Sequence, residues 1–330
     1  MIWTRKLLLL LALAAPAAAE DALMLREIGR IELPGPPGKR FDYLTVDYED
    51  GWIFSAHLGA NQTYVIDRKT RRVLHTIAET PGVEGVTYVP ELRKLYTSHA
   101  GDGTVGVVDL ATMRVAKRIP TGAKPDGSTY AAPHHKLYVT NERAKTESVI
   151  DVREDRVVAT LAFESETGVP IYDPKADLVY VNLQDQNAVA VIDPAKDQVL
   201  ASHAVEGCRG NHGMALDVEG RRAFLACEGN DTLAIFDVDA HRVVARLPLA
   251  PGADVVQFDP GLRRVYVACS SGAIAVFRQD DADHYRVLGN VPVQRRVHSM
   301  AVDVETHRVY APEQEHEGRP VARMIVLEPS

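Results

Sequence analysis

Short stretches of alternating apolar and polar residues follow one another along most of the chain, separated by turns rich in Gly, Asp, Asn and Pro. Four of them, GVTYV, KLYTSH, TVGVVD and RVAKRI, lie in succession between residues 85 and 119. An alternation with a period of two predicts β-strands that bury one face. After the N-terminal segment, no stretch sustains the 3.6-residue period of a helix, so the pattern predicts an all-β fold.

The alternating stretches belong to a longer repeat. Aspartates that close a VID-type motif stand at Asp67, Asp109, Asp151 and Asp193, each 42 residues after the last, and Asp237 follows 44 residues later. We expect these side chains to accept hydrogen bonds from backbone amides of the following turn. A repeat of about 42 residues that contains four strands is typical of one blade of a β-propeller.

The repeat predicts seven blades of four antiparallel strands. Their first strands begin near residues 42, 84, 126, 168, 212, 254 and 298. The seventh unit ends after its third strand, at ARMIVLEPS, whereas LMLREIGRIELP at residues 23–34 matches a fourth strand without a unit of its own. We therefore expect the N-terminal strand to complete the last blade and close the ring.

The segment Leu137–Asn141 reads LYVTN, and degenerate copies of it recur in the other units. It resembles the YVTN repeat of the YncE-like seven-bladed propellers, and the resemblance covers essentially the whole chain after the N-terminal segment. It implies a periplasmic or secreted propeller, related in architecture to lactonase-type propellers, whose biochemical role is mostly unassigned in the family. Fold alone does not define function, because one propeller scaffold serves enzymes, binding proteins and scaffolds.

The first residues have the pattern of a secretory signal peptide. Arg5 and Lys6 precede an apolar run from Leu7 to Ala15, and small residues at 17–19 follow. We expect residues 1–19 to be cleaved near Ala19 and residues 20–330 to form one propeller domain in the periplasm or outside the cell. The apolar run is too short to span a bilayer, and no later segment is long and apolar enough to do so.

Charge and missing motifs exclude several functions. The formal net charge is −8, and about −10 without Arg5 and Lys6, which argues against nucleic-acid binding. The sequence has no G-x-S-x-G, H-E-x-x-H, P-loop or C-x-x-C motif. We expect a monomer whose partner is a small molecule or a periplasmic protein.

Charged and imidazole side chains recur at repeat positions that should face the mouth of the central channel. The first strands begin with Asp42, Glu84, Asp126, His212, Asp254 and His298, and basic residues stand two positions earlier at Arg40, Lys124 and Arg296. A second column, at the ends of the second strands, includes His57 and His99, expected neighbours of Glu84 and Asp126. These side chains are our candidates for a ligand-binding channel mouth.

Carboxylates together with imidazoles are also typical ligands of a divalent cation. The candidate metal ligands are Glu84, Asp126, His57, His99, His212, Asp254 and His298. A competing interpretation is structural, because propeller channels are commonly wet and such side chains can satisfy backbone groups and water.

Three cysteines complete the picture. Cys208 precedes the first strand of the fifth unit and Cys227 ends its second strand, so an antiparallel pair would bring both to the same face. In an oxidising compartment we expect them to form a disulfide. Cys269, at the repeat position of Cys227 one unit later, has no evident partner and is interpreted as a small buried hydrophobic residue.

The leading functional hypothesis is a ligand-binding or protein-interaction module with a polar channel mouth, for which a divalent metal is a candidate cofactor. The first alternative is a metal-dependent lactonase or esterase, by analogy with gluconolactonase-type propellers. The second is an accessory factor of a periplasmic redox or metal-handling system. The sequence assigns no catalytic residue.

Overall fold

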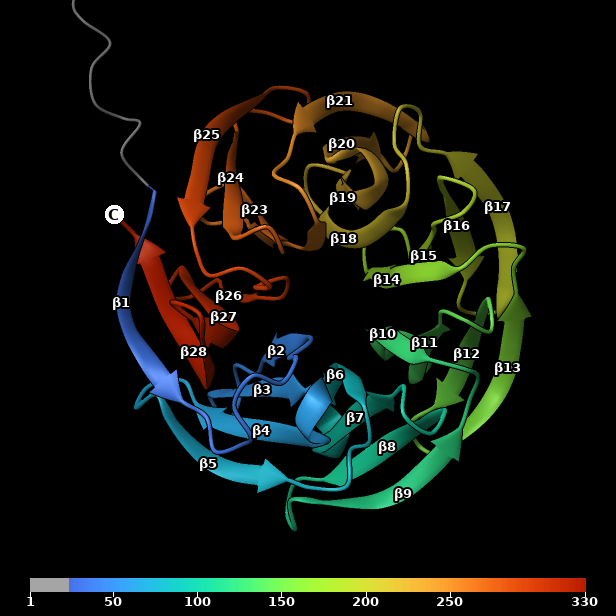
Figure 1. Ribbon diagram of the computed structural model, residues 1–330. Helices are drawn as coiled ribbons and strands as arrows, with labels where there is room; N and C mark the ends of the chain where they lie inside the picture. The colour runs from blue at the N-terminus through green and yellow to red at the C-terminus, as the bar shows by residue number, and fades with distance from the viewer. Residues whose placement is uncertain (1–23) are drawn as a thin grey trace, which may run out of the picture.

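Each alternating stretch of the repeat forms one strand. In the computed structural model, which describes residues 24–330, the strands of this part of the chain form seven four-stranded sheets arranged around a common axis (Figure 1). The fold is therefore the all-β seven-bladed propeller that the repeat predicts. The predicted signal peptide and its cleavage near Ala19 lie outside the described residues.

Blades 1 to 4 each consist of four consecutive strands, ordered from the axis outward. Blade 1 contains β2 (Leu44–Val46), β3 (Trp52–His57), β4 (Gln62–Asp67) and β5 (Arg72–Ile77), and blade 2 contains β6 (Val83–Val89), β7 (Lys94–His99), β8 (Thr104–Asp109) and β9 (Arg114–Pro120). Blade 3 contains β10 (Pro125–Ala131), β11 (Lys136–Asn141), β12 (Thr146–Asp151) and β13 (Arg156–Ala162), and blade 4 contains β14 (Thr167–Asp173), β15 (Leu178–Leu183), β16 (Ala188–Asp193) and β17 (Gln198–Ala204).

Blades 5 and 6 follow the same order. They contain β18 (Asn211–Asp217), β19 (Arg222–Cys227), β20 (Thr232–Asp237) and β21 (Arg242–Pro248), then β22 (Ala253–Asp259), β23 (Arg264–Cys269), β24 (Ala273–Gln279) and β25 (Tyr285–Pro292). Blade 7 has β26 (Ala301–Asp303), β27 (Arg308–His316) and β28 (Arg319–Pro329). Short 3₁₀ turns at Leu58–Ala60, Pro90–Leu92, Ala132–His134 and Glu228–Asn230 join some of the strands.

The N-terminal strand closes the ring, as predicted. Strand β1 (Leu25–Glu32) pairs antiparallel with β28 as the outermost strand of blade 7, from Leu25 opposite Pro329 to Glu32 opposite Arg323. The backbone N–H of Ser330 also donates to the carbonyl of Met24, at 2.7 Å. The two ends of the described chain are thus fixed by backbone hydrogen bonds, and β28 is paired on both sides.

The repeated aspartates have the structural role that the sequence predicts. A side-chain oxygen of Asp67 accepts the backbone N–H of Thr70 at 2.5 Å, and one of Asp151 accepts that of Arg153 at 2.8 Å. Asp109, Asp193 and Asp237 make the corresponding bonds in their own turns. These Asx-type bonds fix the turn between the third and fourth strands of the blade.

Neighbouring blades are also joined by a repeated polar contact. The ammonium of Lys94 in blade 2 lies 2.8 Å from the carboxylate of Asp155 in blade 3, and Tyr96 donates to the same carboxylate. One blade further along, Lys136 lies 2.8 Å from Asp197. Apolar side chains of adjacent sheets fill the space between these contacts, as in the cluster around Tyr96, Val105 and Leu137.

Cys208 and Cys227 form the predicted disulfide, with a Cα–Cα distance of 5.4 Å. It ties the loop before β18 to the end of β19 on the side of the mouth. Cys269 is free and buried, and burial raises the pKa of its thiol to about 12. A thiol of this kind is not ionised at neutral pH, so Cys269 is a small buried side chain rather than a nucleophile.

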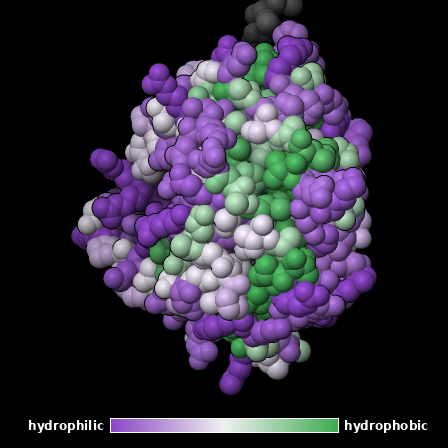
Figure 2. Space-filling model, turned by 90° about the vertical axis from the view of Figure 1, so that its right-hand side faces the viewer, coloured by the Kyte–Doolittle hydropathy of each residue, from purple (hydrophilic) through white to green (hydrophobic). Residues whose placement is uncertain are grey.

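The outer strands are largely solvent-exposed, and the side formed by blades 3 and 4 is the one seen in Figure 2, where apolar side chains lie between polar ones. Exposed apolar side chains there include Val158 in β13 and Val199 and Leu200 in β17. Within residues 24–330, no helix has the length and apolar character needed to cross a membrane.

Candidate functional site

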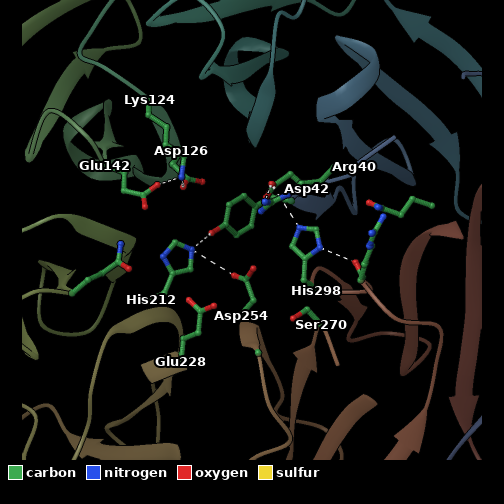
Figure 3. Close-up of a pocket in the computed structure, with 15 residues that line it drawn as sticks. Arg40, Asp42, Lys124, Asp126, Glu142, His212, Glu228, Asp254, Ser270 and His298 are labelled. Atoms are coloured by element: carbon green, nitrogen blue, oxygen red, sulfur yellow. Dashed lines mark hydrogen bonds and ion pairs between the residues drawn. The ribbon is translucent and has the colours of Figure 1, made fainter. Parts of the chain in front are cut away.

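A cavity of about 470 Å³ lies at one mouth of the ring, and we call it the mouth cavity (Figure 3). Almost all of its lining comes from three repeat positions. The position near the start of the first strand contributes Asp42, Asp126, His212, Asp254 and His298. The position two residues earlier contributes Arg40, Lys124, Gly252 and Arg296. The third position, one residue after the predicted second column, contributes Glu142, Gln184, Glu228, Ser270 and Gln314. Tyr43 completes the lining.

The first-strand ring therefore converges on one cavity, as the repeat register predicts. Glu84 is the one acidic member of this ring that does not line the cavity, but its carboxylate lies 4.0 Å from the ammonium of Lys124, directly beside it. Each predicted basic residue, Arg40, Lys124 and Arg296, lines the cavity.

His57 and His99 lie elsewhere. The ring of His57 stacks on Phe41 at 3.9 Å and its Nδ1 is 2.8 Å from the hydroxyl of Tyr64. The Nε2 of His99 is 2.8 Å from the hydroxyl of Thr97. Both side chains are fully buried, and burial lowers the pKa of each to about 4, so they are neutral parts of the blades.

The displacement of this column has a simple cause. His57 and His99 are the last residues of β3 and β7 and are buried within the blades, whereas the residue that follows the second strand lies in the loop at the mouth. The next residue along, represented by Glu142, Gln184 and Glu228, faces the mouth cavity. A column of the repeat chosen one residue later would have identified these side chains from the sequence.

On the side of blades 7 and 1, His298 and Asp42 form an ion pair beside Arg40. The Nε2 of His298 is 3.8 Å from the carboxylate of Asp42, and the guanidinium of Arg40 is 3.4 Å from it. Burial by itself would lower the pKa of His298, but the nearby carboxylate of Asp42 outweighs it and raises the pKa to about 9. Burial would likewise raise the pKa of Asp42, yet His298 lowers it, so the pair is ionised at neutral pH.

His212 of blade 5 contacts the adjacent blade 6 and also the segment that leads into blade 1. Its Nε2 lies 3.2 Å from the hydroxyl of Tyr43 in the segment leading into blade 1 and 3.5 Å from the carboxylate of Asp254 in blade 6. Burial would lower the pKa of His212, but the charges of Asp254 and Asp126 outweigh it and raise the pKa. Tyr43 was absent from the sequence candidates, because its hydroxyl meets His212 only when the ring is closed.

On the side of blade 3, Lys124 lies among three carboxylates. Its ammonium forms an ion pair with Glu142 and lies 3.7 Å from Asp126 and 4.0 Å from Glu84. Burial and the neighbouring carboxylates raise the pKa of Glu84 to about 10 and that of Asp126 to about 6. Glu142 has a lowered pKa, because Lys124 outweighs the effect of its burial.

One oxygen from each of Glu84, Asp126 and Glu142 lies within 4.8 Å of the others, a spacing at which a cation fits. The ammonium of Lys124 already supplies that positive charge. The two acidic groups that the sequence singles out here for a metal, Glu84 and Asp126, thus lie beside a cation of the same chain, and the raised pKa of Glu84 keeps that group protonated at neutral pH.

The backbone at this basic position is left-handed in five blades, a conformation that nineteen residues other than glycine adopt within residues 24–330. In blades 2, 5 and 6 the equivalent residues are Gly82, Gly210 and Gly252, with φ angles of 58°, 61° and 74°. Lys124 and Arg296 have the same left-handed backbone, with φ angles of 56° and 69°. Residues with a Cβ adopt this conformation only at a cost in free energy, so two cationic side chains are held at the mouth against a local preference for glycine.

The whole fold can be compared with solved structures. A streptogramin B lyase superposes with a TM-score of 0.76 at 10% identity, over 93% of this chain and 98% of that one. A chain of the hydrazine synthase of Kuenenia stuttgartiensis superposes with a TM-score of 0.75 at 16% identity, over 88% of this chain and 96% of that one. A chain of a mitotic checkpoint complex gives a TM-score of 0.77 at 12% identity, over 99% of both chains.

These likenesses show the propeller fold alone. Comparisons with protein-family models and with curated proteins give no match. The fold implied by the YVTN resemblance is therefore confirmed, whereas membership of that family has no support beyond the LYVTN segment and its copies. Function has to be argued from the mouth cavity.

Proposed function

We propose that this protein is a ligand-binding propeller of the periplasm or the extracellular space, and that it binds a small polar molecule in the mouth cavity. The N-terminal sequence pattern supports export, and the Cys208–Cys227 disulfide is consistent with an oxidising compartment. The LYVTN segment favours the same location, since the YncE-like propellers it resembles are periplasmic or secreted.

The observation that carries the proposal is the left-handed backbone of Lys124 and Arg296. In three other blades, glycine provides the left-handed backbone at this repeat position. A side chain with a Cβ there costs backbone strain, which Lys124 offsets by its ion pair with Glu142, whereas Arg296 makes no ion pair within residues 24–330; strain of this kind is concentrated at functional sites. Both side chains line the same cavity, together with the buried ion pair of Asp42 and His298.

The cavity has the size and lining of a site for a small, hydrophilic ligand. Its volume of about 470 Å³ lies in the range of small-molecule pockets. Acidic and basic groups alternate around it, so that no single sign of charge dominates. Such a surface recognises a molecule by directed hydrogen bonds and ion pairs rather than by apolar contact.

Metal-dependent hydrolysis is the weaker candidate. A divalent ion at Glu84, Asp126 and Glu142 would have to displace the ammonium of Lys124. His57 and His99, which the sequence offered as further ligands, are buried within the blades. The geometry therefore favours binding, with Lys124 as the resident cation of the carboxylate cluster.

The test is a ligand screen with a variant of the cavity wall. Purified protein is tested by thermal shift against amino acids, sugar acids, polyols and amines, and each hit is measured by isothermal titration calorimetry. We expect at least one class to bind, and Asp254→Asn to weaken that binding at least tenfold. Glu219→Gln, on the far side of blade 5 from the cavity, serves as the control and should bind as the wild type does. The proposal would be refuted if Asp254→Asn bound every hit with the affinity of the wild type, or if no class of compound bound below millimolar concentration.

A further inference from the structure

The two halves of the mouth cavity differ in how well their polar groups are satisfied. In the half formed by blades 1 to 3, Arg40 faces Asp42 and Lys124 is paired with Glu142. In the half formed by blades 5 to 7, the side chains of Glu228, Ser270, Arg296 and Gln314 have no hydrogen bond or ion pair with any other side chain or backbone group in residues 24–330. They come from three consecutive blades and all line the mouth cavity, and we call this set of four side chains the open wall.

Gln314 shows that the open wall is more than a set of surface side chains. Only 9% of this residue is exposed, yet its amide has no partner among the described residues. The polar atoms of this amide keep contact with solvent, so the amide opens onto the cavity, where water or a ligand group can bond to it.

The charges of the open wall have opposite signs at its two ends. Glu228 in blade 5 is an exposed carboxylate, and Arg296 in blade 7 is an exposed guanidinium. Ser270 in blade 6 lies between these blades, and Figure 3 shows Glu228 and Ser270 across the cavity from Lys124 and Glu142. A single ion would be attracted by one end and repelled by the other.

We propose that the ligand is a small zwitterion, a molecule with a carboxylate at one end and an amine at the other. The guanidinium of Arg296 binds the carboxylate through paired N–H donors, and the carboxylate of Glu228 accepts the N–H groups of the ammonium. Ser270 and Gln314 offer neutral hydrogen bonds to the part in between. This inference rests on the proposed function and names the chemical class of the ligand.

The left-handed backbone of Arg296 agrees with this assignment. Arg296 lies at the repeat position that Gly210 and Gly252 occupy in the two preceding blades, and it has no side-chain partner of its own. Its guanidinium therefore lies at the cavity and is not paired with a carboxylate of the described residues. Arg295, its exposed neighbour, does not line the cavity and offers a matched comparison.

The experiment uses the whole mature chain and a homologous series of ω-amino acids from glycine to 6-aminohexanoate. Each is compared by calorimetry with the alkylamine and the carboxylate of the same length. We expect at least one zwitterion to bind ten times more tightly than either single-charge analogue. Arg296→Gln should abolish the advantage of the zwitterion over the amine, and Glu228→Gln should abolish its advantage over the carboxylate.

Two control variants, Arg295→Gln and Glu206→Gln, remove equally exposed charges outside the cavity and should leave the affinity within twofold of the wild type. All four substitutions lie at exposed positions, and a melting curve of each variant verifies folding.

Equal affinity for zwitterion and single-charge analogues, or wild-type affinity in both Arg296→Gln and Glu228→Gln, overturns the inference. That outcome leaves the proposed function intact if another class of polar molecule binds in a manner sensitive to Asp254→Asn. If no class binds in that manner, the proposed function fails as well.

Discussion

Replacing Arg296 by glycine should stabilise the protein while weakening the mouth cavity as a binding site. Arg296 has a φ angle of 69° and is exposed, and its side chain makes no hydrogen bond or ion pair within residues 24–330. The substitution therefore removes no contact that supports the fold. It relieves backbone strain at a position where Gly210 and Gly252 stand in neighbouring blades.

The size of the effect follows from two opposing contributions. Left-handed backbone costs a residue with a Cβ about 1–2 kcal/mol, and glycine avoids this cost. Glycine also makes the unfolded chain more flexible, which reduces the gain by about 0.4–1 kcal/mol. We expect Arg296→Gly to be about 1 kcal/mol more stable than Arg296→Ala, which keeps the strain, and to melt roughly 2 °C higher.

The assay is urea unfolding followed by tryptophan fluorescence, with thermal melts as a second measurement. Gly210→Ala calibrates the strain, because a Cβ there meets nothing closer than 3.5 Å and only the φ angle of 61° penalises it. We expect that variant to lose about 1 kcal/mol. The reasoning is refuted if Arg296→Gly is less stable than Arg296→Ala while Gly210→Ala is destabilised as expected.

Three further predictions concern the ion pairs and the disulfide. Asp42 raises the pKa of His298 from 6.5 to about 9, so the ion pair stabilises the fold fully below pH 6.5 and this contribution is lost as the pH rises to about 9. The free energy of unfolding in urea should fall by about 3 kcal/mol across this range, and by less in His298→Asn. Lys124→Met leaves the carboxylate cluster without its cation, so calorimetry should detect Mn²⁺ or Ca²⁺ binding that the wild type lacks; equal binding by both would contradict this account. The double variant Cys208→Ala/Cys227→Ala should be about 2–4 kcal/mol less stable in urea, and dithiothreitol should bring the wild type to the same value.

The fold was predictable because every structural role in a propeller is repeated. The 42-residue spacing of Asp67, Asp109 and Asp151 marks the turn between the third and fourth strands of successive blades, and the structure places each aspartate in that turn. The missing fourth strand of the last unit likewise indicated the closure by β1. Because seven repeats encode the same local structure, the blade could be predicted even where single copies of the repeat are degenerate.

The candidate site was predictable only in part, because the last residue of a strand is buried in its blade while the next residue, in the loop, can face the cavity. The register placed Asp42, His212 and His298 at one mouth, and these side chains line one cavity. At the ends of the second strands the prediction was wrong by one residue, because it selected His57 and His99, which are buried. Contacts between distant blades, such as Tyr43 with His212, depend on how seven sheets close into a ring, and no local pattern encodes that.

Departures from the repeat carry information of a different kind. The position after Asp42 is Tyr43 in blade 1, whereas blades 2 and 5 have Gly85 and Gly213, where a Cβ would come within 2.3 Å and 1.9 Å of a neighbouring backbone oxygen. The position of Lys124 and Arg296 is glycine in three blades for the reason of backbone geometry. A role that serves the fold recurs from blade to blade, but a ligand is bound once, by a set of residues that need not be alike. Large or charged side chains at positions where several other repeats have glycine are therefore a signal for a candidate site that the sequence contains on its own, and here Tyr43, Lys124 and Arg296 line one cavity.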